Sequence, residues 1–324
     1  MKCNLLLGLL LMTVQFAQME ARAAEVYPSK PVQFIIPVEA GSDGDVLARP
    51  FLQKVSDMLG KPVLVLNKPG AGSSIGYRQV HDAKPDGYTI GWGAATVATN
   101  KLQGLLPYDH SEFSILGGYV TIVPVLFAST RTDKPFKNVE EVLAQARARP
   151  GTVSLGTSGV GYIWWFASRE LEEATGVKFN IIPQTGGAGY TAAQVAGGHV
   201  DVGIMGLAPA KAQLAAHNIV FLGVVGSRRA SAPYNNIPSL KELGYSVSIE
   251  STHFVVGPDK LPKDISDKLV KTFEVAANDK EFQQFLVKLD ALPTYVAPDQ
   301  VVKNLNQQKI VYRDIMKKAG LLKE

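Results

Sequence analysis

The sequence has very little cysteine, no cluster of basic residues and no long hydrophobic run. Its 324 residues contain one cysteine, Cys3, and the formal net charge is only +4. Nucleic-acid-binding proteins usually display a basic patch, so we expect no nucleic-acid partner. A bilayer-spanning helix needs about 18 or more consecutive apolar residues, and the sequence has no such run. These absences argue against a nucleic-acid-binding protein and against an integral membrane protein.

Residues 1–23 have the pattern of a secretory signal peptide. A lysine precedes the apolar run Leu5–Leu11, and the segment Ala21–Ala23 resembles an A-x-A cleavage site. The run is too short to span a bilayer. Cleavage after Ala23 removes Cys3, so we expect a periplasmic, soluble mature protein without disulfides. Thiolate metal centres, cysteine nucleophiles and iron–sulfur clusters are thereby excluded.

The composition and patterning favour an α/β protein of two domains. Hydrophobic residues make up 46% of the chain, which excludes a mainly disordered protein. Single cores stop growing at about 250–300 residues, so two domains are expected. Short β-rich runs alternate with longer helical patterns until Leu261, after which the chain reads as mostly helical. Because these late helices must pack on an earlier sheet, we predict a discontinuous first domain (residues 24–124 plus 250–324) and a second domain (residues 125–249).

Four glycine-rich loops each follow a predicted strand and open a predicted helix. They span residues 39–45, 69–76, 156–161 and 185–189. Such loops direct free backbone N–H groups and the positive end of a helix toward one point, which suits a carboxylate or a phosphate. In open α/β sheets, ligands bind beyond the carboxyl ends of the strands. One such loop is usually just a tight turn, but several loops in two domains favour a ligand cleft between them.

Two short motifs match enzyme patterns. Residues 72–76 fit G-x-S-x-G, the turn that carries the nucleophile of many hydrolases, so an exported hydrolase using Ser73 stays open as an alternative. The sequence singles out no acid–histidine pair to support it. Residues 187–192 resemble a dinucleotide fingerprint, but Asp201 lies inside the next predicted strand and not after it. We therefore predict no catalytic residue and no cofactor.

The first glycine-rich loop carries three carboxylates, Glu39, Asp43 and Asp45. Such oxygens suit calcium, but the EF-hand spacing with its later glutamate is absent, so no metal site is predicted. Asp45 lies near the start of a predicted helix, where a negative charge is stabilised by about 0.3–1 kcal/mol. Farther along, Trp164 and Trp165 are about 100° apart on a predicted helix, so one can face a cleft while the other fills the core.

Several segments match, in order, the pattern of one known family. They include PVEAGSDGDVLAR (37–49), NKPGAGSSIG (67–76), KPDGYT (84–89), LPYD (106–109), RPG (149–151), GGHVD (197–201) and IPS (237–239). Together they resemble the substrate-binding proteins of tripartite tricarboxylate transporters, also called the Bug family, from about Tyr27 to the C-terminus. The resemblance implies a type II periplasmic binding protein with two α/β lobes around a ligand cleft. Two crossovers, near residues 122–128 and 248–254, would join the lobes.

The resemblance also implies how the protein works. We expect a monomeric receptor, not an enzyme, that captures a small carboxylate-bearing solute by hinge closure and delivers it to the membrane subunits of the transporter. In the family, backbone amides, hydroxyls and water hold the carboxylate, and the G-x-S-x-G segment is not catalytic. A sensor that presents the solute to a membrane receptor stays open as an alternative. The predicted ligand-binding residues are Glu39, Ser42, Asp43, Asp45, Thr96, Thr157, Ser158, Gly159, Gly161, Trp164, Thr185, Gly186 and His253.

The chain departs from the family pattern at positions that bear on the ligand. Glu39 and Asp43 make the first loop more acidic, and Tyr162–Trp165 replaces small polar residues. Thr185 stands where a lysine is common, and Met205 where an aspartate is frequent. The added negative charge and the lost lysine argue against a small tricarboxylate such as citrate. The aromatic residues favour a bulkier or ring-bearing solute with one carboxylate.

Overall fold

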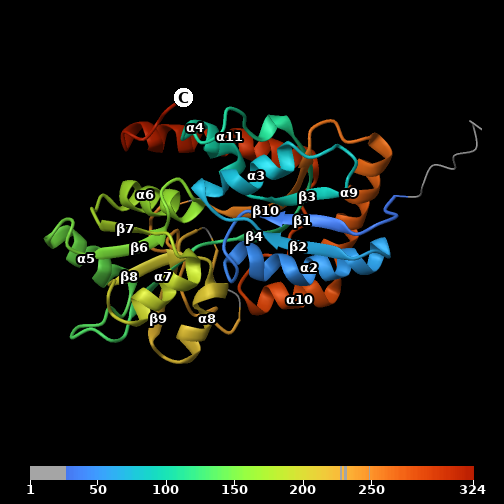
Figure 1. Cartoon of the computed structure of the whole chain (residues 1–324). Coiled ribbons are helices and arrows are strands. Elements are labelled where there is room, and N and C mark those ends of the chain that lie inside the picture. The colour runs from blue at the N-terminus through green and yellow to red at the C-terminus, as the bar shows by residue number, and fades with distance from the viewer. Residues whose placement is uncertain (1–26, 227, 230–231, 248) are drawn as a thin grey trace, which may run out of the picture.

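Two mixed sheets organise the chain (Figure 1). The structure is a computed structural model that describes residues 27–226, 228–229, 232–247 and 249–324. The signal peptide predicted at residues 1–23 lies outside the described residues. The first sheet has the order β2 (Val63–Asn67), β1 (Val32–Ile36), β3 (Thr89–Gly93), β10 (Ser251–Pro258), β4 (Phe113–Ile122). The second has the order β7 (Asn180–Gln184), β6 (Ser154–Ser158), β8 (Val202–Met205), β5 (Val125–Ser129), β9 (Ile219–Val224).

Helices surround both sheets, and each sheet with its helices is called a lobe here. The helices of the first lobe are α2 (Asp43–Leu59), α3 (Ser74–His81), α4 (Thr96–Leu102), α9 (Lys263–Ala277), α10 (Lys280–Lys288) and α11 (Pro298–Lys318), with 3₁₀ turns η1 (Ala71–Ser73) and η2 (His110–Glu112). Those of the second lobe are α5 (Val139–Ala148), α6 (Ile163–Thr175), α7 (Gly187–Ala196) and α8 (Leu207–Ala215). The described helices include none that is long and apolar enough to cross a membrane. The two-lobed α/β architecture confirms the predicted fold class.

The chain passes between the lobes twice. Strand β4 ends at Ile122 in the first sheet, and β5 begins at Val125 in the second. After β9 the chain returns to the first sheet as β10, which pairs antiparallel with both β3 and β4. The boundaries predicted at residues 124/125 and 249/250 fall in these two connections. Strand β10 thus pairs with residues of β3 and β4 that lie about 130 residues or more before it in the sequence.

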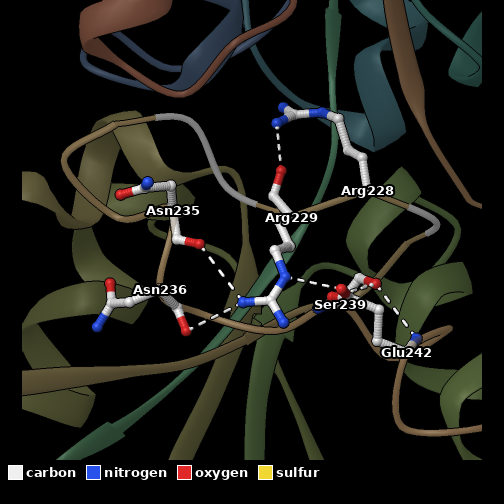
Figure 2. Close-up of polar contacts among 6 residues, drawn as sticks. All are labelled: Arg228, Arg229, Asn235, Asn236, Ser239 and Glu242. Carbon is white, nitrogen blue, oxygen red and sulfur yellow. Dashed lines mark hydrogen bonds and ion pairs between the residues drawn. The ribbon is translucent and has the colours of Figure 1, made fainter.

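The connection that leads from β9 toward β10 is held by an arginine network (Figure 2). The Arg229 side chain pairs with Glu242, with Nε 2.7 Å from Oε1, and its Nη1 lies 3.5 Å from the carbonyl oxygens of Asn235 and Asn236. Glu242 in turn accepts a hydrogen bond from the Ser239 N–H at 2.9 Å. Arg228 donates to the Arg229 carbonyl at 2.9 Å. These bonds tie Arg228 and Arg229 to the described segment 235–242.

The late helices pack mainly on the first lobe, as the sequence predicts. Phe51 of α2 stacks on Tyr119 of β4 at 4.2 Å between ring centroids and meets Phe273 of α9 at 5.9 Å. Helix α11 does more, because it also reaches the second lobe along one side of the molecule (Figure 1). There Tyr312 stacks on Phe166 of α6 with centroids 4.2 Å apart. The C-terminal helix therefore joins the two lobes in addition to the two chain crossings.

Two of the predicted glycine-rich loops are shorter than expected. Strand β6 extends to Ser158 and β7 to Gln184, because these strands pair in parallel through the partners Ser158 and Gln184. Helix α7 then begins at Gly187, so the loop predicted at residues 185–189 is reduced to Thr185 and Gly186. The periodicity of the sequence could not reveal this pairing, since it depends on the neighbouring strand.

Candidate functional site

A cavity of about 380 Å³ lies between the lobes and is lined by both. In the first lobe, its lining consists of residues that follow β1, residues at η1, and side chains of β3 and β10. From the second lobe it takes the starts of α6 and α7. The lining residues are Val38, Glu39, Ser42, Asp43, Gly44, Gly70, Ala71, Gly72, Trp92, Ser158, Gly159, Val160, Tyr162, Ile163, Trp164, Gln184, Thr185, Gly187, Ala188, Ser251 and His253. The carboxyl ends of β1, β6 and β7 thus open on one space, which is where open α/β sheets bind ligands.

Asp43, the first residue of α2, is the buried acid of this cavity. Its side chain is 5% exposed, and Oδ2 accepts a hydrogen bond from Trp164 Nε1 at 3.3 Å. The other oxygen, Oδ1, is buried and makes no hydrogen bond of standard geometry with any residue that the structure describes. Burial raises the pKa of Asp43 to about 7, although the Trp164 indole and the Gly206 backbone partly offset the effect. The cavity therefore contains a carboxyl group that titrates near neutral pH.

Asp45, two residues later, has a different environment and does not line the cavity. It accepts hydrogen bonds from the Gly41 N–H at 3.0 Å, from Arg49 at 2.7 Å and from Asn67 at 3.0 Å. Burial alone would raise the pKa of Asp45, but these donors outweigh it and hold the pKa below its usual range. Asp45 therefore fixes the loop after β1 in place, a structural contribution that the prediction of a ligand contact did not include.

Aromatic rings and a neutral histidine form one wall of the cavity. Trp92 at the end of β3 meets His253 of β10 edge to face, with centroids 4.8 Å apart. His253 is 2% exposed, and burial lowers its pKa to about 3, so its imidazole is uncharged at neutral pH. Its Nδ1 is buried without a hydrogen-bond partner in the described part of the chain. Tyr162 and Trp164 line the cavity from the second lobe.

Serine hydroxyls supply the remaining polar groups. The Oγ atoms of Ser42, Ser158 and Ser251 are buried and have no hydrogen-bond partner among the described residues. The described lining includes no arginine and no lysine. A ligand here meets hydroxyls, backbone amides and two acids, Glu39 and Asp43, instead of a cationic side chain.

The predicted site residues divide into two groups. Those that line the cavity are Glu39, Ser42, Asp43, Ser158, Gly159, Trp164, Thr185 and His253. Those outside its lining are Asp45, Thr96, Thr157, Gly161 and Gly186. Sequence reasoning missed Trp92, Tyr162, Gln184 and Ser251. A weak signal existed for Trp92 and Gln184, since both lie at the carboxyl end of a strand.

Some residues outside the lining have other partners. Thr96 Oγ1 lies 2.7 Å from the Tyr77 hydroxyl within the first lobe. Gly161 contributes to the contact between the lobes, because its carbonyl accepts from Thr99 Oγ1 at 3.3 Å and from Gln103 Nε2 at 3.4 Å. Together with the bond between Asp43 and Trp164, these contacts hold the two lobes against one another beside the cavity.

Comparison with known proteins agrees with this geometry. Residues 47–321 match the tripartite tricarboxylate transporter family receptor, TctC. The chain belongs to this family. It is 30% identical over 316 residues to the UPF0065 protein in the gbd 5′ region of Cupriavidus necator, covering 95% of this chain and 93% of that protein. The periplasmic binding protein BugD is 28% identical, with a TM-score of 0.81 over 92% of this chain and all of that one.

A further solved structure shares the fold. The R. palustris protein Rpa4515, solved with adipate, superposes with a TM-score of 0.84 at 23% identity, covering 91% of this chain and 98% of that one. The resemblance drawn from the sequence motifs is confirmed. As a TctC family receptor, the protein is a solute-binding protein, and its relatives include periplasmic binding proteins and not enzymes.

The hydrolase alternative gains no support in this TctC receptor. The serine of the G-x-S-x-G pattern is in fact Ser74, the first residue of α3, and not Ser73. Neither serine lines the cavity. Ser73 is fully buried, and its polar neighbour is the Tyr162 hydroxyl. A tyrosine in that place does not supply the histidine base that a serine hydrolase uses. Over the described residues, no group of three or more histidine, cysteine or acidic side chains is placed to hold a metal ion.

Proposed function

We propose that this receptor captures one small organic acid, with a ring or other apolar body, in the cavity between its lobes. Three helices, α2, α6 and α7, begin at the cavity, and none has a side-chain N-cap hydrogen bond. Their first backbone N–H groups therefore lack side-chain acceptors, and each helix start carries a partial positive charge. This convergence of uncapped helix starts is the observation that carries the proposal, because it suits a carboxylate.

The charge of the cavity supports an acid with few charges. Glu39 and Asp43 line it, and the described lining includes no cationic side chain. Each further carboxylate of a ligand would approach these acids in a space of low dielectric, where like charges repel strongly. A monocarboxylate with an apolar body avoids that cost and fills the wall formed by Trp92, Tyr162 and Trp164.

We further propose that the solute is trapped by hinge closure. The two predicted domains move about the connections between β4 and β5 and between β9 and β10, which are the crossings of the chain between the sheets. Hydrogen bonds from Thr99 and Gln103 to the Gly161 carbonyl join the lobes beside the cavity. A ligand that contacts both lobes binds the closed state preferentially and shifts the population toward it. The closed, monomeric receptor then delivers its solute to the membrane subunits of the transporter.

A thermal-shift screen of organic acids tests this function. The mature chain is melted with benzoate, phenylacetate, adipate, malate and citrate, each at millimolar concentration. A ligand that binds the folded state raises Tm, by an amount that follows its concentration relative to Kd. We expect the largest shifts from the monocarboxylates with rings and none from citrate. If no acid raises Tm, the proposed ligand class is rejected. If citrate gives the largest rise in Tm, the proposal that the ligand carries few negative charges is rejected.

A further inference from the structure

We infer that the solute also carries a nitrogen cation, such as an ammonium group, which binds the carboxyl group of Asp43. The ligand class is then a zwitterion with an apolar or aromatic body. This inference rests on the proposed function, because it assumes that the cavity between the lobes is the binding site. The proposed function gives the ligand a carboxylate. The inference adds an ammonium group and assigns Asp43 as the side chain that binds it.

The first argument is that Asp43 Oδ1 has unused hydrogen-bonding capacity. The residue lines the cavity and is 5% exposed, and among the described residues none makes a hydrogen bond of standard geometry to its Oδ1. Leaving a buried polar group unpaired is costly, and an unpaired buried charge costs more. A donor from the ligand would remove that cost. An ammonium group is the matching donor, since charge-assisted hydrogen bonds are shorter and stronger than neutral ones.

The second argument is that the carboxyl group has little freedom to turn elsewhere. A Cβ built on Gly206 would lie 2.6 Å from Oδ1 and 2.9 Å from Oδ2 of Asp43, so the carboxyl group packs directly on the Gly206 backbone. Trp164 Nε1 holds Oδ2 from the other lobe. Glycine at residue 206 therefore makes room for the acid, and the carboxyl group is held between Gly206 and Trp164.

The third argument concerns the surroundings of Asp43. Glu39 is a second acid in the lining, and no described lysine or arginine there neutralises either group. Trp92, Tyr162 and Trp164 also line the cavity, and aromatic faces attract cations. The ionisable side chains that share the lining with Asp43 are Glu39, Tyr162 and His253, of which His253 is neutral. A cationic group of the ligand would therefore be attracted to Glu39 and Asp43, the two acids on the first-lobe side of the cavity.

A zwitterion would use the two lobes differently. Asp43 occupies the start of α2 with its own negative charge, which leaves the starts of α6 and α7 as the favoured place for the ligand carboxylate. The ammonium group then binds the first lobe and the carboxylate the second. A single solute of this kind makes charged contacts with both lobes, so it favours closure.

Matched acids with and without nitrogen test the inference. Isothermal titration at pH 8 compares 4-(aminomethyl)benzoate with 4-methylbenzoate, and phenylalanine with 3-phenylpropanoate. We expect at least one zwitterion to bind more tightly than its partner acid. Asp43→Asn should weaken that zwitterion roughly 10- to 100-fold, the range for a hydrogen bond to a charged group, and should not weaken the plain acids, because it removes a negative charge that repels them. Asp264→Asn is the matched control, since Asp264 is an exposed acid in the first turn of α9.

The outcomes separate the inference from the proposed function. If plain acids bind and the zwitterions do not, the inference is wrong and the proposed function stands. If neither kind of acid binds, the proposed function fails and the inference fails with it. A protonated Asp43 could instead donate to an acceptor on the ligand. In that case plain acids would bind more tightly at pH 5 than at pH 8 and would tolerate Asp43→Asn, which would overturn the inference. Circular dichroism of both variants confirms that they fold.

Discussion

Asp43 of the first lobe accepts a hydrogen bond from Trp164 of the second lobe, with 3.3 Å between Oδ2 and Nε1. The bond joins the start of α2 to the start of α6 at the wall of the cavity. A charged carboxylate is a stronger acceptor than a neutral carboxyl group. Because burial raises the pKa of Asp43 to about 7, the strength of this contact depends on pH in the neutral range. Asp43 therefore lines the cavity, contacts the second lobe and titrates near neutral pH.

The first prediction is that Asp43→Asn changes how stability depends on pH. The folded-state pKa of Asp43 is raised, so the folded protein holds this proton more tightly than the unfolded chain does. The stability that Asp43 contributes is therefore present below about pH 4 and is lost as pH rises to about 7. Above pH 7 the ligand-free variant should be more stable than the wild type by about 1–3 kcal/mol. Urea unfolding at pH 4, 6 and 8 measures the difference.

The comparison between the two proteins isolates Asp43 from the other acids. Asp45 has a depressed pKa and changes stability in the opposite direction, but it is present in both proteins. A difference in unfolding free energy that does not grow between pH 4 and pH 8 would contradict the burial argument. Asp264→Asn, at an exposed acid of the first lobe, is measured beside it as the control substitution.

The second prediction concerns His253 and has the opposite sign. Burial lowers its pKa to about 3 in the folded protein, whereas an unfolded histidine titrates near 6.5. The contribution of His253 to stability is therefore present above about pH 6.5 and is lost as pH falls toward 3. His253→Gln lacks this titration, so its stability deficit relative to wild type should shrink by about 1–3 kcal/mol between pH 7 and pH 4. Chemical unfolding at the two pH values provides the measurement, and a deficit that stays constant would show that His253 is solvated.

Sequence patterns predicted the architecture because it depends on local signals that repeat. Strands followed by glycine-rich loops and helices recur in both lobes, and the helical run after Leu261 has too few strands of its own. These signals predicted two α/β lobes, and the structure confirms that fold class. In the structure β10 lies in the first sheet. The place of β10 between β3 and β4 was not predictable, because antiparallel pairing over so long a separation leaves no local pattern.

The candidate site was harder to predict than the fold, and two neighbouring acids show why. Asp43 and Asp45 fall in one predicted loop, at residues 39–45, and their types and spacing give no reason to separate them. Two positions along a helix turn the side chain by about 200°, so one acid faces the cavity and the other faces Arg49 and Asn67. Ser251 was missed for another reason, because its strand reaches the cavity only through the long-range pairing of β10.

The third prediction concerns the contact of α11 with the second lobe. Tyr312 is 1% exposed and stacks on Phe166 at 4.2 Å between centroids. Tyr312→Ala should lower the unfolding free energy by about 3–5 kcal/mol, the usual range for removing a buried aromatic ring. Tyr312→Phe should be neutral or slightly stabilising, because the buried Tyr312 hydroxyl has no hydrogen-bond partner within residues 27–226, 228–229, 232–247 and 249–324. Ile310→Ala, at a position that is 73% exposed on the same helix, is the control and should have little effect. Thermal melts of the three variants measure these changes.

The last prediction concerns lobe closure and depends on Gly161. This residue has a φ of +81°, and a Cβ added to it would collide with the side-chain amide of Gln103 in the first lobe. Gly161→Ala should therefore strain the backbone and also push Gln103 away, which removes its hydrogen bond to the Gly161 carbonyl. Gly151→Ala provides a matched control, because Gly151 has a φ of +73° and no atom within 4 Å of an added Cβ.

Both alanine variants should lose about 1–2 kcal/mol of stability from the left-handed backbone. Gly161→Ala alone should weaken the contact between the lobes, which small-angle X-ray scattering detects as a larger radius of gyration in the absence of ligand. Adding Gln103→Ala to Gly161→Ala removes the collision and should bring the radius back toward that of Gly151→Ala. Equal radii for the two single variants would show that Gly161 and Gln103 do not control closure, and the proposed hinge would then rest on the bond between Asp43 and Trp164.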